Sequence, residues 1–211
     1  MATKAWIENE YVFVTTDVSV APSDAIDVPD GTTPFDLVID NGVLRLKTDT
    51  EKLVQLKQQK LKELDSLTTE YITTYYPLTK QNSDSADVAY WQNYLLMYGI
   101  DPVKSRQTLA YTIVSFFDQG WSFEQCVQFF LSQFPDPNPT KEPGGPIYWG
   151  YAVEQIIKSG IRMEWLKRVK EKCRQYISEV NNATSITELQ NIVFDYSNLP
   201  FPNLPTLFKL L

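Results

Sequence analysis

The chain has 211 residues, of which 43% are hydrophobic and 21% are charged, and it carries a formal net charge of −7. This composition is typical of a folded globular protein, and the acidic balance argues against nucleic acid as a partner, because nucleic-acid binding depends on Lys and Arg. The sequence contains no histidine, which excludes Ser-His-Asp and Cys-His catalytic arrangements and the common zinc and non-haem iron sites.

Residues 1–48 are predicted to form a small antiparallel β module. The run WIENEYVFVT, which begins at Trp6, has the composition of two strands with a turn near Asn9. Asn41-Gly42 lies between two alternating apolar arms and predicts a type I′ turn, because both residue types tolerate positive φ. One short strand is expected at residues 25–28. The module is acidic and too small to bury a large core alone, so we expect it to dock on the helices or on a partner.

A long linking helix is predicted over residues 49–77. Thr48 and Glu51 fit a capping box, in which each side chain bonds the backbone of the other residue. The helical pattern then continues to Tyr76, and Pro77 ends it because proline cannot continue a helix.

The apolar stripe of this helix allows two interpretations. Its heptad spacing is interrupted at Lys57 and Thr68, and additional leucines make the stripe wider than a two-stranded seam. An amphipathic helix that packs within its own domain fits this pattern. Self-association through residues 49–76, or packing against a partner helix, is the alternative.

Residues 78–211 are predicted to form an all-helical region. The expected helices begin at Ser83 or Asp84, at Pro102 and at Phe123, then cover residues 147–158 and 161–180, and a last one with Leu189, Ile192 and Val193 follows Ser185. Gly99 and Gly120 are expected to end the first two helices. Ser122 and Ser185 are each followed three residues later by Gln or Glu, which predicts capping boxes. Residues 162–174 hold six basic and two acidic side chains, which predicts a solvated face or a contact with an acidic partner.

Two proline-rich segments interrupt this region. Residues 135–146 contain five prolines and two glycines, which predicts an extended loop or a linker. Residues 198–211 combine three prolines with many leucines and phenylalanines, a composition that disordered tails do not have. This tail is therefore expected either to lie in a groove of its own fold or to engage another chain.

The order of these elements predicts an α+β protein, with a small N-terminal antiparallel β module, a long linking helix and a C-terminal all-helical region. No apolar run approaches the ~20 residues that span a membrane, and the N-terminus lacks the apolar centre of a signal peptide. We therefore expect a cytoplasmic, non-catalytic protein without metal or other cofactor and without a membrane partner. An enzyme that works through paired carboxylates is the alternative, although no pair stands out in the sequence.

One part of the sequence resembles a known family. The run from WIENEYVFV through KLVQLKQQKLKELDSLTTEYITTYYPLTKQ is similar to the tail fibre assembly proteins of tailed bacteriophages and to related proteins encoded beside tail fibre genes. Members commonly have a strand-rich N-terminus, a helix rich in Lys, Leu and Glu, and a "YP…Q" motif like residues 76–81. They also often end in a capped helix and a Pro-rich tail, like ATSITELQNIVFDYSNLPFPNLP. The resemblance covers residues 4–98 and 183–205 and does not extend to residues 99–160.

This resemblance implies a non-catalytic, protein-binding function. Members of the family help a trimeric tail fibre to fold and assemble, bind it near its receptor-binding tip, and in some cases remain attached. The expected location is the host cytoplasm during assembly, with retention in the virion tail as an open alternative. The alternative function is a permanent structural component of a tail fibre or baseplate. Candidate partner-binding residues, for each of which core packing is the other interpretation, are Trp6, Tyr11, Phe13, Phe201, Leu204, Leu207 and Phe208.

Overall fold

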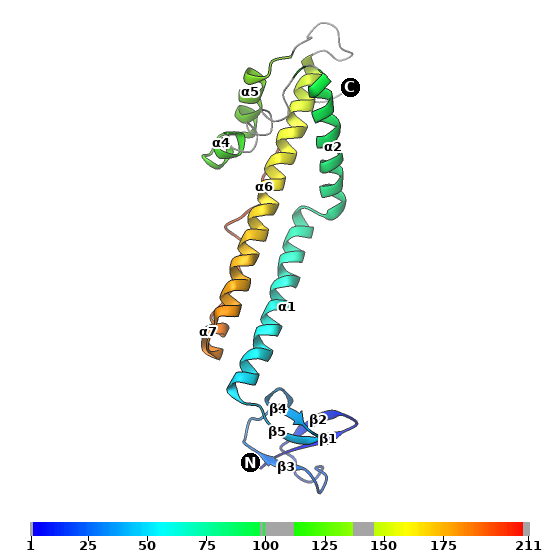
Figure 1. Cartoon of the computed structure of the whole chain (residues 1–211), viewed down its shortest axis with the longest axis vertical. Helices are drawn as coiled ribbons and strands as arrows, with labels where there is room; N and C mark the ends of the chain where they lie inside the picture. Colours follow the sequence, from blue (N-terminus) through cyan, green and yellow to red (C-terminus); the bar gives the residue numbers. More distant parts are fainter. Residues whose placement is uncertain (1, 98, 100–111, 137–145, 209–211) are drawn as a thin grey trace. The chain divides into compact units, whose positions relative to one another are not determined.

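The computed structural model describes residues 2–97, 99, 112–136 and 146–208. Strands β1 to β5 come first and are followed mostly by helices (Figure 1), which confirms the predicted α+β class. The chain divides into two compact units. The first, which we call the β unit, comprises Met1–Glu63 and Ile177–Val193, and the second, the helical unit, comprises Leu64–Tyr176 and Phe194–Leu211.

The β unit contains two antiparallel sheets, in which β1 (Thr3–Glu8) pairs with both β2 (Tyr11–Thr15) and β3 (Ile26–Val28), while β4 (Leu37–Asp40) pairs with β5 (Val43–Leu46). A short 3-10 helix, η1 (Pro34–Asp36), precedes β4. Both predicted hairpin turns are confirmed. Asn9 and Asn41 have positive φ angles of 50° and 52°, in the left-handed region that Asn tolerates better than most residues.

The strands have a small core, as expected for so short a module. Ala5, Leu37 and Leu44 are buried, and four partly buried aliphatic side chains pack around them. Polar contacts add links from the strands to the start of α1 (Asp49–Tyr75). Lys52 pairs with Asp36 at 2.9 Å, and Lys47 donates a hydrogen bond to Gln55.

The capping box at the start of α1 is confirmed. The Glu51 N–H donates to the Thr48 hydroxyl at 3.2 Å, and the Glu51 carboxylate accepts from the Thr48 N–H at 2.8 Å. The polar residues that interrupt the heptad seam bond within the chain. Lys57 donates to the Asn181 carbonyl at 2.7 Å, and the Thr68 hydroxyl donates to the Leu64 carbonyl at 2.7 Å.

The next helix, α2 (Leu78–Met97), begins earlier than predicted. The expectation of a start at Ser83 or Asp84 was wrong, because Pro77 follows the end of α1 and is also the residue from which α2 begins. Its carbonyl accepts the first helical bonds, from the N–H groups of Lys80 and Gln81 at 2.9 and 3.0 Å. Proline is tolerated at the start of a helix, where its missing N–H has no intrahelical partner in any case.

Helices α4 (Val114–Asp118) and α5 (Phe123–Gln133) lie on the two sides of Gly120. Gly120 has a φ of 92°, as expected for a residue that ends a helix. The predicted start at Pro102 lies outside the described residues. The Ser122 capping box is confirmed, since its hydroxyl accepts from the Gln125 N–H at 3.1 Å and its N–H donates to the Gln125 side chain at 2.8 Å.

Helix α6 (Pro146–Asn182) is one continuous helix of 37 residues. The prediction of two helices, over residues 147–158 and 161–180, was therefore wrong. Gly160 lies inside the helix, where glycine costs only about 1 kcal/mol relative to alanine. Buried Ile157 and Ile161 on the two sides of this position contribute more than that when they leave water, about 1.5–3 kcal/mol each.

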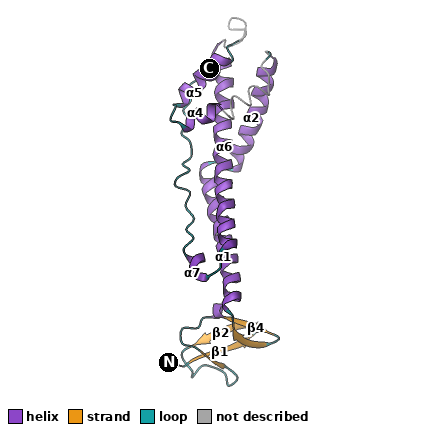
Figure 2. Cartoon of the chain, turned by 60° about the vertical axis from the view of Figure 1, so that its left-hand side comes forward, coloured by secondary structure: helices purple, strands orange, loops and turns teal. Residues whose placement is uncertain are grey.

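The chain after α6 has little regular structure (Figure 2). The short helix α7 (Ile186–Gln190) ends before Ile192 and Val193, which were expected to belong to it. The Ser185 hydroxyl accepts from the Glu188 N–H at 3.1 Å, as predicted, but the Glu188 carboxylate bonds the Thr184 N–H rather than that of Ser185. Residues 192–208 contain neither helix nor strand.

The described residues of the helical unit form two hydrophobic clusters. One is formed by α4, α5 and the first half of α6, around residues such as Phe130, Trp149 and Ile157. The other joins the second half of α1 to α6 and to the segment after α7, around Leu64, Trp165 and Tyr196. Within the ranges that the structure describes, no helix is both long enough and apolar enough to cross a membrane.

Candidate functional site

The predicted contact residues of the first hairpin share one face of the sheet. Trp6 on β1 lies directly opposite Phe13 on β2, and Tyr11 is two residues before Phe13, so all three side chains point to the same side. The rings of Trp6 and Phe13 stack with centroids 5.5 Å apart. Tyr11 is 71% exposed and Phe13 is 41% exposed. We call these three residues the hairpin aromatic face.

The strand that carries this face is also an edge strand. In the order β2-β1-β3, β2 has a neighbour on one side within its sheet. The two-residue turn makes Glu8 and Tyr11 a hydrogen-bonded pair, and such pairs alternate along an antiparallel ladder. The N–H and C=O groups of Val12 and Val14 therefore point away from β1, and among the described residues no backbone hydrogen bond outside the ladder involves them.

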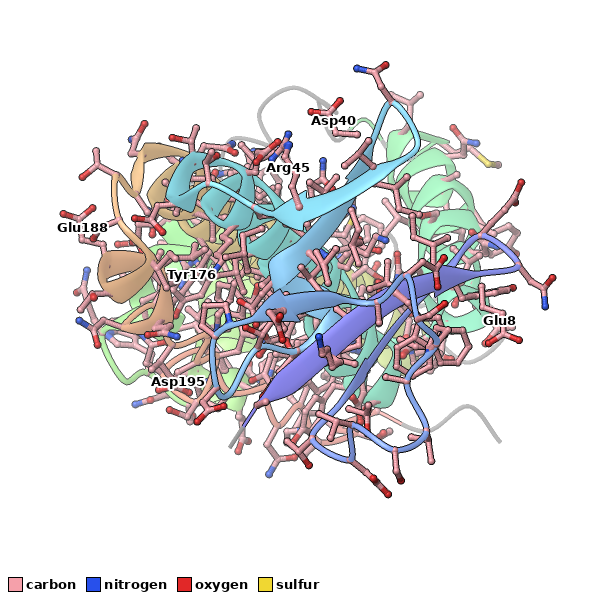
Figure 3. The ribbon with its side chains drawn as sticks, turned by 90° about the horizontal axis from the view of Figure 1, so that it is seen from below. Glu8, Asp40, Arg45, Tyr176, Glu188 and Asp195 are labelled. Atoms are coloured by element: carbon pink, nitrogen blue, oxygen red, sulfur yellow. The ribbon has the colours of Figure 1, made fainter. Side chains whose placement is uncertain are left out.

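The surroundings of the hairpin aromatic face are apolar and acidic. Val20, 62% exposed, lines a shallow pocket of about 300 Å³ together with Trp6, Glu8, Pro22 and Asp24. The Glu8 carboxylate, labelled in Figure 3, accepts a hydrogen bond from the Trp6 indole at 3.4 Å. An apolar surface with carboxylates at its rim suits a protein surface that carries Lys or Arg beside apolar groups.

Ion pairs hold the second hairpin in place within the β unit. Arg45 lies 2.9 Å from Asp40, both of which are labelled in Figure 3, and 2.8 Å from Glu51. The Arg45 guanidinium, together with the Thr48 N–H, lowers the pKa of Glu51 to about 2. Lys52 and Thr33 lower the pKa of Asp36 to about 2. These carboxylates therefore remain charged well below neutral pH, and their contacts position the strands rather than supply acid–base chemistry.

The predicted contact residues of the tail lie in the helical unit. Phe201 is partly buried in the second cluster, with its ring 4.9 Å from that of Trp165 and 6.0 Å from that of Tyr75. Leu204, Leu207 and Phe208 are partly buried against the first cluster. The described part of the tail, residues 198–208, thus lies in its own fold, which is one of the two alternatives that its sequence left open.

A groove that the sequence did not indicate runs beside the segment after α7. It has a volume of about 680 Å³ and is lined by one face of α1, with Glu70, Tyr71 and Tyr75, and by residues that include Phe194 and Asp195. The i, i+4 pair Tyr71 and Tyr75 was the available signal in the sequence, but the opposite wall of the groove comes from residues more than a hundred positions away.

A hydrogen bond from α6 holds Asp195, which lines this groove, in place. The Tyr176 hydroxyl donates to the Asp195 carbonyl at 2.9 Å, and both residues are labelled in Figure 3.

Two clusters of ionisable residues are buried in the helical unit. Asp84 accepts hydrogen bonds from Arg162 at 3.0 Å and from the Tyr76 hydroxyl at 2.9 Å. Burial and the Asp84 carboxylate raise the pKa of that hydroxyl far above its usual value. Glu154 and Lys158 form an i, i+4 pair on α6 at 2.5 Å. Each of these groups has a charged partner, and among the described residues no set of three or more Cys, Asp or Glu side chains could hold a metal ion.

The comparisons with known proteins do not assign a family. No protein-family model matches the chain, and neither curated proteins nor solved structures gave a match. Among the features described above, the hairpin aromatic face is the best candidate site, because its exposed aromatic side chains lie on a strand whose outer edge is unpaired. The candidate tail residues, by contrast, are partly buried in the chain's own clusters.

Proposed function

We propose that the chain is a non-catalytic assembly protein of a bacteriophage tail fibre. It binds the trimeric fibre near its receptor-binding tip and aids its folding or assembly in the host cytoplasm. The resemblance of residues 4–98 to tail fibre assembly proteins supports the proposal. The observation that carries it is the hairpin aromatic face on edge strand β2, with Tyr11 71% exposed.

The physical basis of the proposal is strand addition. Trimeric β folds form slowly through non-local contacts and expose unpaired edges and apolar surface while they assemble. An edge strand can pair with such an edge through main-chain hydrogen bonds, while side chains beside it supply specificity. On β2, Val12 and Val14 offer the main-chain groups, and Tyr11 and Phe13 offer the aromatic anchors that are enriched at protein interfaces.

Co-expression tests the proposal directly. The fibre protein encoded beside this chain is produced with and without it, and the soluble trimer is measured by gel filtration. We expect more soluble trimer when the chain is present. An equal yield under both conditions would rule out an assembly function. Purified particles that contain the chain at a fixed ratio to the fibre would instead favour a permanent structural component.

A pair of variants tests the surface itself. Tyr11→Ser removes the most exposed ring of the hairpin aromatic face, whereas Tyr90→Ser makes the same chemical change at a side chain on α2 that is 58% exposed. We expect Tyr11→Ser to weaken capture of the fibre at least tenfold and Tyr90→Ser to leave it unchanged, since interface aromatics commonly contribute about 1.4 kcal/mol or more, roughly tenfold in Kd. Equal effects of the two changes would place the contact elsewhere.

A proline pair tests strand addition. The Val12 N–H points away from β1, whereas the Phe13 N–H lies in a hydrogen-bonded pair of the ladder, so Val12→Pro and Phe13→Pro remove an outward and an inward donor respectively. Val12→Pro is expected to reduce fibre binding with the smaller loss of stability, and Phe13→Pro to destabilise the hairpin. Full binding by a folded Val12→Pro variant would argue against pairing through this edge.

A further inference from the structure

The tail is held on α6 by a buried ion pair. Glu154 is fully buried, with 0% exposure, and its Oε2 atom accepts hydrogen bonds from two consecutive backbone N–H groups, those of Leu207 at 3.1 Å and Phe208 at 2.8 Å. Its Oε1 atom lies 2.5 Å from the Lys158 Nζ atom, which also donates to the Thr206 hydroxyl at 3.3 Å. A carboxylate and an ammonium on successive turns of one helix therefore bind three consecutive tail residues.

A glycine on the same helix makes room for the Phe208 ring. A Cβ atom at Gly150 would lie 2.5 Å from a ring carbon of Phe208 and within 2.8 Å of two others, closer than real Cβ contacts occur. Gly150 is one helical turn before Glu154, so the side that accepts the tail N–H groups also accepts the ring. In mid-helix, glycine is disfavoured relative to alanine by about 1 kcal/mol, and contact with Phe208 gives a physical reason for its presence.

These contacts have the form of peptide recognition. Glu154 binds backbone N–H groups, which every residue except proline has. Lys158 donates to the Thr206 hydroxyl, and Leu204, Leu207 and Phe208 make apolar contacts. The bound segment has no helix or strand and its apolar side chains stay partly exposed, so it is not an integral layer of the core. Main-chain hydrogen bonds for affinity, with pockets for a few side chains, are the usual basis of binding an extended peptide.

We propose that this side of α6 is a binding site for an extended peptide with the chemistry of Leu204–Phe208, and that the tail occupies it in competition with such a segment of a partner protein. The partner segment has a Leu-Phe pair whose two backbone N–H groups are available to Glu154. It also has a leucine three residues before this pair, as Leu204 is before Leu207. A tethered tail has an effective concentration in the millimolar range. A free peptide therefore binds weakly while the tail is in place, and more tightly when the tail is released.

The test uses the full-length chain and a labelled peptide, NLPTLF, which repeats residues 203–208. In Leu207→Ser/Phe208→Ser the tail loses its apolar anchors, while Gly150, Glu154 and Lys158 are unchanged. Fluorescence anisotropy is expected to show saturable binding of the peptide to this variant, at least tenfold tighter than to the unaltered chain, since the tail no longer competes. Circular dichroism establishes that the variant is folded. Should it not fold, Phe208→Ala, which removes only the ring beside Gly150, replaces it.

The matched control adds Gly150→Ala to the released variant. Alanine favours the helix but its Cβ occupies the position of the peptide's Phe ring, so peptide binding is expected to fall at least tenfold while the helix content stays the same. A second peptide with Ala in place of Phe should bind equally weakly to both proteins. A folded, released variant that does not bind NLPTLF, or that binds it equally well with Gly150→Ala, would overturn the proposal. Neither result bears on fibre assembly through β2, so the two proposals fail separately.

Discussion

Asp84→Asn removes the charge at the centre of the buried network in the helical unit. The Asp84 side chain is 3% exposed and lies 2.7 Å from the Lys80 Nζ atom and 3.0 Å from Arg162. It also accepts a hydrogen bond from Tyr76 at 2.9 Å. Asparagine has the same size, but it is neutral and its NH₂ group can face a guanidinium. The change therefore leaves Arg162 beside a dipole rather than a charge.

The structure sets the size of the expected effect. Removal of one partner from a buried ion pair costs about 3–5 kcal/mol. The Arg162 side chain is 15% exposed and that of Lys80 is 43% exposed, so water can partly compensate both cations. We therefore expect a loss of about 3 kcal/mol in the free energy of unfolding of the helical unit, at the low end of that range.

The same contacts predict how this loss depends on pH. Burial would raise the pKa of Asp84, but hydrogen bonds from Lys80 and Arg162 outweigh it and keep the pKa below its ordinary value of 3.8. A carboxyl whose pKa is lower in the folded state stabilises the protein above its unfolded pKa. That stabilisation is lost as the pH falls through the folded pKa. The difference in stability between the unaltered chain and the Asp84→Asn variant should thus be complete at neutral pH and shrink below about pH 3.8.

Urea unfolding measures the change, with the free energy extrapolated linearly to water. Because two compact units need not unfold together, the measurement uses a Trp6→Phe background, in which the remaining tryptophans all belong to the helical unit. Asp87→Asn is the matched control, since it removes the same charge from the same helix. The reasoning would be refuted if Asp84→Asn and Asp87→Asn lowered the free energy of unfolding by amounts that agree within about 0.5 kcal/mol.

Three further changes test other parts of the structure. Tyr196→Phe removes the hydroxyl that lies 2.7 Å from that of Thr68 and should cost about 1 kcal/mol in the urea assay; an unchanged midpoint would show that this buried pair adds nothing. Gly120→Ala places a Cβ atom on a residue with a φ of 92° and should cost roughly 1–2 kcal/mol in the same assay, so a neutral result would contradict the positive φ. Because Lys52 and Thr33 lower the pKa of Asp36 to about 2, its stabilisation is complete above the unfolded pKa and lost as the pH falls towards 2. The protection of the β4 and β5 amides against hydrogen exchange, taken relative to an unstructured peptide at the same pH, should then fall on acidification, and fall less in Lys52→Met.

Elements with local causes could be predicted from the sequence. The Asn41-Gly42 turn depends on two residues that tolerate positive φ, and the caps at Thr48 and Ser122 depend on side chains that reach three residues along the chain. Such signals need no knowledge of the rest of the fold. They gave the strand module, the start of α1 and the start of α5 with their boundaries correct to one or two residues.

Elements with non-local causes could not be predicted in this way. The two helices predicted over residues 147–158 and 161–180 are one helix, because burial of Ile157 and Ile161 in the cluster with α4 and α5 outweighs the low helix propensity of Gly160. The proximity of Tyr71 to Phe194, Asp195 and Tyr196 depends on the path of the chain after α7. No pattern within residues 67–75 contains that information, so the groove could not be found in advance.

Core packing was the other interpretation of the candidate partner-binding residues, and the structure shows how aromatic side chains build the core of the helical unit. Tyr and Trp side chains on the helices donate hydrogen bonds to carbonyl groups of segments without regular structure. Trp149 donates to Phe134 at 3.0 Å, Trp165 to Leu199 at 2.7 Å, and Tyr71 to the same Leu199 carbonyl at 2.8 Å.

These hydrogen bonds separate the two uses of aromatic residues. A segment such as 194–201 has no ladder of its own, so its buried carbonyls need donors from elsewhere, and rings with a polar end supply both burial and a donor. Tyr11 and Phe13 have no such role, because they lie on the open face of a three-stranded sheet, on its edge strand, with Tyr11 71% exposed. The fold therefore explains Tyr71, Trp149 and Trp165 in the helical unit, and it leaves the hairpin aromatic face available for the partner contact that we propose.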